Sequence, residues 1–214
     1  MYAFSLIGMT EQGKSRKARE LITTRGMQMY GALVNDVNNE YGATRRDRET
    51  GEERPSVNLP VISSAGEANA YPRSRFVTNA GDSMKEYLKI VREKRNTTVI
   101  FEECTAFFKG RTPPGLCEMI INKGHTYNNY IFMWHSIRSV PPELLGLMDW
   151  VILFKTGDNE AIVKQKDVKL LPYWLVLQSK QKGTQPFIID WQREQFDEGN
   201  YKRMREIYLK SKMR

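Results

Sequence analysis

The chain has 214 residues, of which 40% are hydrophobic and 27% are charged, a balance typical of one globular domain. No apolar run approaches the ~18 residues needed to cross a bilayer, and the N-terminus lacks the long apolar stretch of a secretory signal. Two cysteines, Cys104 and Cys117, provide no disulfide framework and suit a reducing interior. The formal charge of +8 is compatible with binding to a polyanion, although alone it is a weak indication.

Strands and helices are predicted to alternate along most of the chain. Glycine and cap residues mark the helix ends: Gly26 closes the first helix, and Asp82 or Ser83 caps the second. The alternation predicts an α/β fold with a mostly parallel central sheet and flanking helices. In chain order we expect a strand at 2–7, a helix at 14–26, strands at 29–37 and 76–77, a helix at 81–95, a strand at 97–102, a helix at 113–124, and strands at 130–135 and 150–154.

One internal segment and the tail depart from this alternation. Residues 38–60 are polar and charged, and we interpret them as a solvated insertion or mobile loop. Residues 173–191 predict an antiparallel hairpin with strands at 173–179 and 186–191 around the turn KQKGT. Residues 198–212 predict an amphipathic basic helix at the end of the chain.

The stretch GMTEQGKS, residues 8–15, has the spacing of a phosphate-binding loop and lies between a predicted strand and a predicted helix. Such a loop wraps phosphate with backbone N–H groups at a helix N-terminus, while a lysine reaches the terminal phosphates and a hydroxyl ligates Mg²⁺. The alternative is an ordinary turn before a basic helix. We expect the nucleotide to be bound by Gly8, Met9, Thr10, Glu11, Gln12, Gly13, Lys14, Ser15 and Arg16.

A nucleotide-hydrolysing site also needs acidic groups on a neighbouring strand. The stretch TTVIFEE ends in Glu102 and Glu103. Glu102 is expected to hold the water shell of the metal, together with Ser15 as metal ligand, and Glu103 to polarise the attacking water. Kinases with this loop do not generally need such a glutamate, because their acceptor is a substrate hydroxyl. The alternative is a strand that ends in solvent-exposed acids.

A third polar group follows the next predicted strand, in YIFMWHSIRSVPPELL. His135 and Ser136 are candidates to contact the γ-phosphate or the attacking water. Arg138 is a candidate to bind a phosphate or a neighbouring subunit. The alternative for His135 is a structural role, in which it caps a buried strand.

Taken in order, these pieces resemble the FtsK–HerA superfamily of DNA-pumping ATPases. The order runs from strand, GMTEQGKS and helix to VIFEE, then to a strand that ends in HSIRSVPPELL, and then to DWVILF. The small size is most similar to the genome-packaging ATPases of membrane-containing icosahedral viruses. The resemblance spans residues 2–191. Its loop and acidic motifs are shared with the wider P-loop class, whereas the HSIRSVPP segment points to the packaging branch.

The resemblance implies a RecA-like P-loop core in a single domain that covers residues 1–214. It further implies ATP and Mg²⁺ as cofactors, a ring that is expected to be a hexamer, and translocation of DNA regardless of its sequence into a preformed capsid. Capsid or membrane-vertex proteins would be partners, and the locations would be the host cytoplasm and the packaging vertex of the virion.

The chain departs from the family pattern at some positions. Glu102 stands where the family usually has aspartate, and His135 or Ser136 where it often has glutamine. Many relatives carry a Gly-Arg pair before the fourth strand, where this chain has GH at 124–125. Arg111 and Arg138 are therefore the candidates for an arginine that acts on the ATP of a neighbouring subunit.

Basic residues near the expected loops have a role in this interpretation. Lys109, Arg111, Lys180 and Lys182 are expected to face a central pore and contact the phosphate backbone of DNA. Taken singly, each lysine is more commonly a plain solvated side chain. The chain contains no recognition-helix or zinc pattern, which argues against a regulator that reads sequence.

Three other functions fit parts of the pattern. An assembly ATPase of filamentous viruses shares the same core but usually carries a membrane span. A nucleoside or nucleotide kinase would use residues 38–60 as a lid, although Glu103 and the HSIR segment argue against it. A ring that binds nucleotide without hydrolysing it is separated from an ATPase only by an activity assay.

Overall fold

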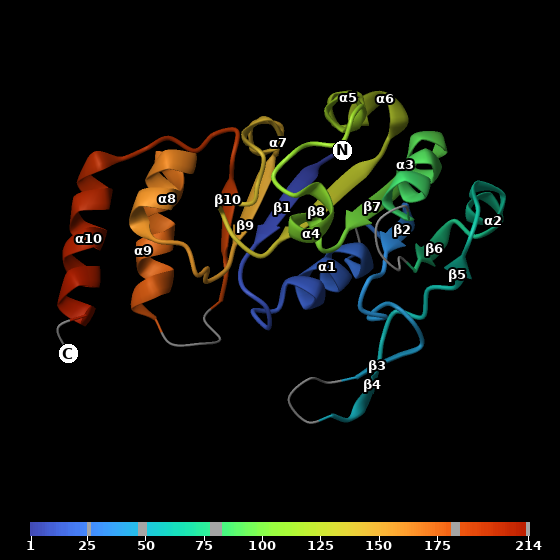
Figure 1. Ribbon diagram of the computed structural model, residues 1–214, viewed down its shortest axis with the longest axis horizontal. Coiled ribbons are helices and arrows are strands. Elements are labelled where there is room, and N and C mark those ends of the chain that lie inside the picture. The colour runs from blue at the N-terminus through green and yellow to red at the C-terminus, as the bar shows by residue number, and fades with distance from the viewer. Residues whose placement is uncertain (25–26, 47–50, 78–82, 181–184, 213–214) are drawn as a thin grey trace.

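The computed structural model describes residues 1–24, 27–46, 51–77, 83–180 and 185–212. Its centre is an eight-stranded sheet of order β10-β9-β1-β8-β7-β2-β6-β5 (Figure 1). Neighbouring strands in this sheet are parallel except β9 and β10, which are antiparallel. The strands of this sheet are β1 (Ala3–Ile7), β2 (Gly31–Asn35), β5 (Val61–Ile62), β6 (Arg73–Phe76), β7 (Thr97–Phe101), β8 (Asn129–Trp134), β9 (Trp150–Leu153) and β10 (Phe187–Asp190).

Both faces of the sheet are covered, and this explains why its central strands are apolar at nearly every position. In β1, Ala3 and Ile7 belong to one hydrophobic core and Phe4 and Leu6 to the other, on opposite faces. Helix α1 packs on the face that carries Phe4 and Leu6, and residues of most of the remaining helices pack on the opposite face. The helices are α1 (Lys14–Thr23), α2 (Ala65–Ala70), α3 (Ser83–Glu93), α4 (Cys104–Phe108), α5 (Leu116–Ile121), α6 (Lys123–Thr126), α7 (Pro142–Gly146), α8 (Glu160–Lys166), the 3₁₀ helix η1 (Val168–Leu170), α9 (Leu171–Ser179) and α10 (Glu198–Lys212).

The predicted α/β class with a mostly parallel sheet is confirmed. The predicted strands in the first three quarters of the chain are present with ends shifted by a few residues, and the C-terminal helix spans the predicted residues 198–212. The helix expected at 113–124 is divided into α5 and α6 at Asn122. Gly26, the predicted end of the first helix, and Asp82, one of the two predicted caps of the second, lie outside the described residues.

The hairpin predicted at 173–191 is wrong in its first half. Residues 171–179 form the helix α9, and the antiparallel partner of β10 is β9. A short apolar run buried on several sides has no clear period, so sequence alone does not separate a strand from a helix there. Trp174, Leu175 and Leu177 are buried in the core, and Pro172 stands in the first turn, where proline is favoured. Of the predicted turn KQKGT, residues 181–184 lie outside the described residues.

The charged segment 38–60 is only partly the solvated insertion that we expected. Its middle carries the small antiparallel pair β3 (Thr44–Arg46) and β4 (Glu53–Pro55), which projects from the body of the protein in Figure 1. Its two ends are packed, because Tyr41 and Leu59 are buried in the core beneath α1. The base of the insertion is therefore part of the domain.

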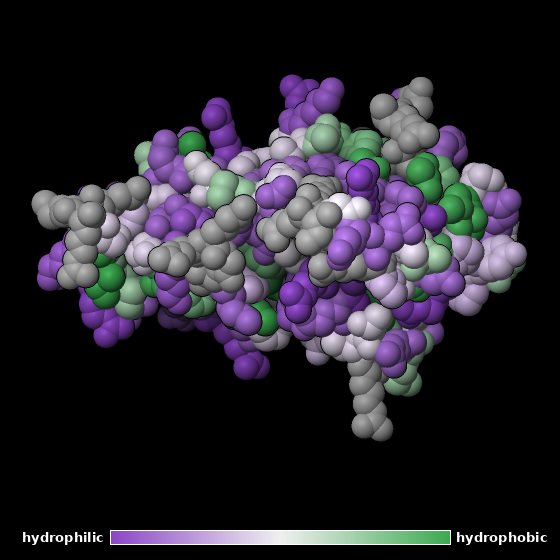
Figure 2. Space-filling view, turned by 90° about the horizontal axis from the view of Figure 1, so that it is seen from below, coloured by the Kyte–Doolittle hydropathy of each residue, from purple (hydrophilic) through white to green (hydrophobic). Residues whose placement is uncertain are grey.

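The surface is mostly polar where Figure 2 shows it, with hydrophobic residues in small separate patches. Cys104 is buried and Cys117 is half-buried, and they form no disulfide with each other. Among the described residues, no helix combines the length and the apolar character required to cross a membrane.

The aromatic core around β8 provides a test of the fold. Phe132 is fully buried and stacks on Phe101 with ring centroids 4.9 Å apart. We expect Phe132→Ala to lower the free energy of unfolding by about 3–5 kcal/mol in urea denaturation, because it leaves a cavity in a packed core. The matched control is Phe196→Ala, which truncates a phenylalanine that is 37% exposed and should cost much less. Equal losses in the two variants would contradict this packing.

Candidate active site

The phosphate-binding loop is hydrogen-bonded to the chain at the ends of β8 and β9, the two strands on either side of β1. The backbone N–H of Gly8 donates to the carbonyl of Trp134 at the end of β8, over 3.0 Å. The backbone N–H of Met9 donates to the carbonyl of Lys155, just after β9, also over 3.0 Å. These bonds lead the chain away from the carboxyl edge of the sheet and back into α1.

Glycine is required at both glycine positions of the loop motif, Gly8 and Gly13, for different reasons. A Cβ atom at Gly8 would lie 2.5 Å from the Cβ of Phe154, so no larger residue fits without a shift of the strand end. Gly13 has φ of 90°, in the left-handed region, and stands immediately before the first residue of α1. The sequence pattern therefore has a local structural cause at both positions.

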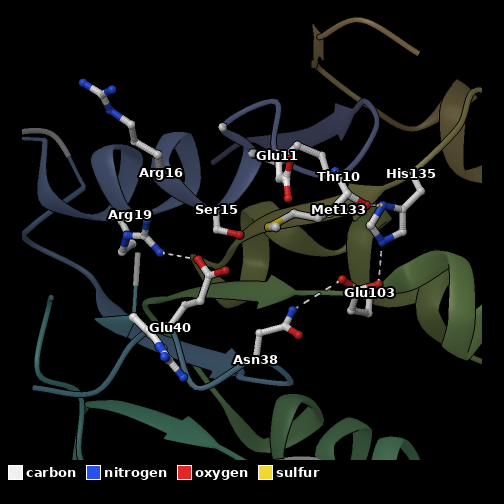
Figure 3. A pocket seen from close by; sticks show the side chains of 13 residues that line it. Thr10, Glu11, Ser15, Arg16, Arg19, Asn38, Glu40, Glu103, Met133 and His135 are labelled. Atoms are coloured by element: carbon white, nitrogen blue, oxygen red, sulfur yellow. Dashed lines mark hydrogen bonds and ion pairs between the residues drawn. The ribbon is translucent and has the colours of Figure 1, made fainter. Parts of the chain in front are cut away.

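Lys14 and Ser15 begin α1 and lie at the centre of the loop. The Nζ of Lys14 donates to the carbonyls of Gly8 and Met9, at 2.6 and 2.8 Å, and the side chain is buried. The ammonium group thus spans the loop that would enclose a phosphate, while the hydroxyl of Ser15 projects into the adjoining cavity (Figure 3). This is the arrangement that a nucleotide with a bound metal requires.

The cavity beside the loop has a volume of about 220 Å³ and is lined by residues from several elements. Its walls come from the loop and α1, from the segment after β2, from the end of β7 and from the end of β8 (Figure 3). Of the predicted nucleotide-binding residues, those that line it are Thr10, Glu11, Gly13, Lys14, Ser15 and Arg16. Met9 and Gln12 line a second cavity, which shares Thr10 and His135 with the first.

Glu102 lies directly after β7 and is almost fully buried, with 1% of its surface exposed. The side chain of Asn35, at the end of β2, fixes its backbone: Oδ1 accepts from the Glu102 N–H at 2.6 Å, and Nδ2 donates to the Glu102 carbonyl at 3.2 Å. Neither carboxylate oxygen has a hydrogen-bond partner among the described residues. Burial raises the pKa of Glu102 well above its usual value, the charges of Glu40, Asp36 and Glu103 raise it further, and the side chain of the nearby Tyr41 acts in the opposite direction.

These features of Glu102 suit a position next to a cation. A buried carboxylate is costly unless a positive charge compensates it or the group binds a proton. Within the described part of the chain, no group of three histidine, cysteine or acidic side chains could hold a metal ion by itself. Mg²⁺ does not need one, because it usually keeps several waters and binds one or two protein groups together with substrate phosphates. Ser15 lines the cavity and Glu102 does not, so their joint role in holding a metal that arrives with the nucleotide stays a prediction.

Glu103 faces the cavity and is engaged from both sides. Its Oε2 lies 2.6 Å from Nε2 of His135, and its Oε1 accepts from Nδ2 of Asn38 at 3.4 Å (Figure 3). Its φ of 52° lies in the left-handed region, at the sharp turn from β7 into α4. The two consecutive glutamates thus point to different surroundings, Glu102 into the protein and Glu103 into the cavity.

His135 connects Glu103 to the phosphate loop. Its Nδ1 lies 3.5 Å from the hydroxyl of Thr10, and its backbone N–H donates to the hydroxyl of Thr105 at 3.0 Å. A chain of contacts therefore runs from Thr10 in the loop through the imidazole to the carboxylate of Glu103. A group in this place contacts both the loop and the acid that is predicted to polarise water.

The structure places the other predicted catalytic residues outside this cavity. The hydroxyl of Ser136 bonds that of Ser139 at 3.1 Å, within the turn after β8. Arg111 and Arg138 have exposed side chains in the turns after α4 and β8, and neither lines the cavity. The site thus brings together Lys14 and Ser15 with Glu103 and His135, while the roles of the arginines stay predictions.

The segment after β2 supplies Asn38 and Glu40 to the cavity, and neither residue was predicted for the site. Arg19, on α1, also lines it, and its Nη1 pairs with Oε2 of Glu40 at 2.7 Å. A signal was present, because Asp36, Asn38 and Glu40 directly follow a buried strand, where the polar ends of parallel strands meet. The charge of the neighbouring residues led us to interpret the whole segment as solvated.

A buried ion pair holds this segment in place. Asp36 is fully buried and accepts from the backbone N–H groups of Glu40, at 2.8 Å, and Tyr41, at 3.1 Å. Nη1 of Arg75, on β6, donates to Asp36 at 2.8 Å, and its Nε donates to the carbonyl of Leu59 at 3.0 Å. The pair therefore fixes the start and the return of the insertion, and with them the placement of Asn38 and Glu40.

Comparisons with known proteins identify solved structures with a similar fold. No protein-family model matches the sequence, and no curated protein matches it. The genome packaging NTPase B204 from Sulfolobus turreted icosahedral virus 2, in complex with AMP, is similar in structure with a TM-score of 0.69 and 14% identity, over 92% of this chain and 95% of B204. The same protein in complex with AMPPCP has a TM-score of 0.67 and 15% identity, over the same shares of the two chains.

A second protein of this kind is also similar. B204 of Sulfolobus turreted icosahedral virus, described as its DNA-packaging ATPase, has a TM-score of 0.58 and 16% identity, over 92% of this chain and 95% of that one. Identities this low establish likeness of fold, and the coverage shows that the likeness extends over nearly the whole of both chains. The chain therefore has the fold of these viral genome-packaging NTPases.

Proposed function

We propose that this protein is an ATPase that translocates DNA, and that it packages a viral genome into a preformed capsid as an oligomeric ring of the FtsK–HerA type. One observation carries the proposal: the phosphate loop meets two consecutive glutamates of different character at one edge of the sheet. The lysine and serine of the loop suit phosphate and metal, and the buried Glu102 suits the metal's water shell. Glu103 faces the cavity, where water would attack.

The proposed hydrolysis divides the work among these residues. Lys14 neutralises charge on the transferring phosphate, and Ser15 and Glu102 hold the metal. Bound Mg²⁺ would supply further positive charge to the phosphate oxygens. Glu103 polarises the attacking water, and His135 holds its carboxylate while contacting the loop through Thr10. A kinase would not need Glu103, His135 and Thr10 in this arrangement, because its acceptor is a substrate hydroxyl and not water.

The coupling to DNA rests on other observations. Lys109, Arg111 and Lys180 are exposed, so they are available to phosphate backbones, while Lys182 lies outside the described residues. B204, whose fold this chain shares, is a genome-packaging NTPase and has been determined with AMP, AMPPCP and ATP-γ-S. We further propose that an arginine of a neighbouring copy acts on the nucleotide, with Arg111 and Arg138 as candidates, because both side chains are exposed and lie outside the cavity of their own chain.

The first test addresses the loop. We expect Lys14→Ala to reduce ATP hydrolysis by roughly a hundred-fold or more, measured as phosphate release, because it removes a cation from the transition state. Lys17→Ala is the matched control: Lys17 lies on the same helix but pairs with Glu20 at 2.6 Å, and its loss should leave turnover near the parental rate. Parental turnover in Lys14→Ala would refute the phosphate-loop assignment.

The second test separates the two glutamates. Glu103→Gln should keep nucleotide affinity and lose hydrolysis, because it removes the water-polarising charge and leaves the metal site intact. Glu102→Gln should weaken Mg²⁺-dependent nucleotide binding, because a neutral amide compensates a cation less well. Calorimetric binding and turnover assays on both variants distinguish the roles. Equal loss of nucleotide affinity in both would show that the division is wrong.

The third test concerns assembly and DNA. If an arginine acts on a neighbour's ATP, specific activity should rise with protein concentration, and DNA should raise it further in a way that added salt suppresses. Mixing Arg111→Ala or Arg138→Ala chains with Lys14→Ala chains should restore part of the turnover, since mixed interfaces contain one intact site. Activity independent of concentration and DNA, with phosphorylation of a nucleoside instead, would favour the kinase.

A further inference from the structure

Asn35 ends β2, and its side chain extends the contact between β2 and β7 by one residue. The register of these parallel strands pairs Asn35 with Phe101, the last residue of β7. The Asn35 side chain, which is fully buried, then reaches the next residue, Glu102. Its Oδ1 accepts from the backbone N–H of Glu102 at 2.6 Å, and its Nδ2 donates to the backbone carbonyl of Glu102 at 3.2 Å. Both ends of one amide therefore bind the main chain of the same residue.

The two hydrogen bonds require the amide of asparagine. A primary amide carries a donor and an acceptor side by side, so the two bonds also decide which end of the amide faces which backbone group. An aspartate at position 35 would turn a second acceptor toward the carbonyl of Glu102, and a leucine of similar size would offer neither group. The residue type at the end of β2 thus has a direct effect on the main chain at the end of β7.

The main chain of Glu102 leads into the turn that carries Glu103. Glu103 has φ of 52°, a left-handed conformation that residues with a Cβ atom rarely adopt. Such a conformation persists only where the surrounding structure holds it. On the helix side, the N–H of Ala106 donates to the carbonyl of Glu103 at 2.9 Å. On the strand side, the two bonds from Asn35 hold the residue that precedes the turn.

This turn directs the carboxylate of Glu103 into the cavity, where its Oε2 lies 2.6 Å from Nε2 of His135 (Figure 3). The phosphate loop is held independently, because the N–H groups of Gly8 and Met9 donate to carbonyls at the end of β8 and beyond β9. A shift at the end of β7 would therefore move Glu103 relative to the bound phosphates and leave the loop in place.

We infer that Asn35 is a positioning residue for hydrolysis: it binds the backbone of Glu102 and thereby sets the place of the Glu103 carboxylate and of the water that this carboxylate polarises. The inference rests on the proposed function. Asn35 does not line the cavity, so it acts through Glu103 and not on the nucleotide. A misplacement of about 1 Å in a reacting group can cost roughly a hundred-fold in rate, which makes such a contact important for turnover.

The competing explanation is that Asn35 only satisfies buried backbone groups and so contributes to stability. The chain contains a matched control, because Asn128 binds the other end of β7 with a similar pair of bonds. Its Oδ1 accepts from the N–H of Thr97 at 3.0 Å, and its Nδ2 donates to the carbonyl of Lys94 at 2.9 Å. Asn128 is also buried. Loss of either amide should lower stability, but only loss of Asn35 should lower turnover.

The experiment compares Asn35→Ala with Asn128→Ala in the full chain, by steady-state phosphate release from ATP and by calorimetric affinity for a non-hydrolysable ATP analogue in EDTA. For Asn35→Ala we expect kcat per folded chain to fall by about ten- to a hundred-fold and the affinity to change by less than about two-fold, because the phosphate loop stays in place. Asn128→Ala should keep kcat near the parental value. Thermal unfolding measures the folded fraction of each variant.

A double variant tests whether Asn35 acts through Glu103. Glu103→Gln removes the charge that Asn35 is inferred to position. In that background, Asn35→Ala should therefore lower the residual turnover no further. A loss as large as in the parental chain would overturn the positioning role.

The outcomes separate this inference from the proposed function. If the parental chain releases no phosphate from ATP, both fail. If it does, and Asn35→Ala and Asn128→Ala have equal kcat, or Asn35→Ala loses as much affinity as kcat, only the role of Asn35 fails. Should Asn35→Ala not fold, Asn35→Asp and Asn128→Asp carry the same comparison, because aspartate keeps the size and the acceptor of asparagine and loses its donor. A lower kcat in Asn35→Asp then supports the inference, and equal values overturn it.

Discussion

Two backbone hydrogen bonds hold the phosphate loop, from Gly8 to the end of β8 and from Met9 to Lys155, two residues beyond β9, and the rest of the site is arranged around them. They are possible because β1 lies between these two parallel strands, which end at the same edge of the sheet. The same geometry brings the end of β7 next to that of β8. A change in strand order would separate the loop from its acids while leaving every local motif intact.

The two consecutive glutamates at the carboxyl edge of the sheet lie in different environments. Glu102 is buried, its backbone is clamped by Asn35, and its carboxylate has no hydrogen-bond partner among the described residues. Glu103, the next residue, is turned into the cavity by a left-handed backbone conformation and is bound by His135. Adjacent residues of one type thus acquire different chemistry because the turn after β7 sends their side chains in different directions.

The likeness to the B204 structures and the chemistry of the site support different conclusions. At 14% identity the likeness establishes the fold, and a fold of this kind serves many activities. Hydrolysis is proposed instead from the side chains at the carboxyl edge of the sheet. The ring stays a proposal, with Arg111 and Arg138, which lie outside the cavity, as the candidates to act on a neighbouring copy.

Local patterns were sufficient for much of the site. The loop spacing, the paired glutamates and the histidine after the next strand were predictable because each is a short motif that ends a strongly apolar strand. The α/β class was predictable for the same reason, since strands buried on both faces form apolar runs that alternate with helices. By itself, the sequence determined which residues could carry the chemistry and that they would lie at strand ends.

Tertiary structure decided what local patterns leave open. Residues 171–179 are apolar on nearly all sides, so only their packing between the sheet and α10 shows them to be a helix. Glu40 and Asn38 stand in a charged stretch that resembles a solvated loop, and they enter the site only because Asp36 and Arg75 bind that stretch to the sheet. Ser136 and His135 are neighbours with equal claims in sequence, yet only the imidazole lines the cavity. In each case the deciding contact joins residues far apart in the chain, and such contacts form only when the strands have taken their order.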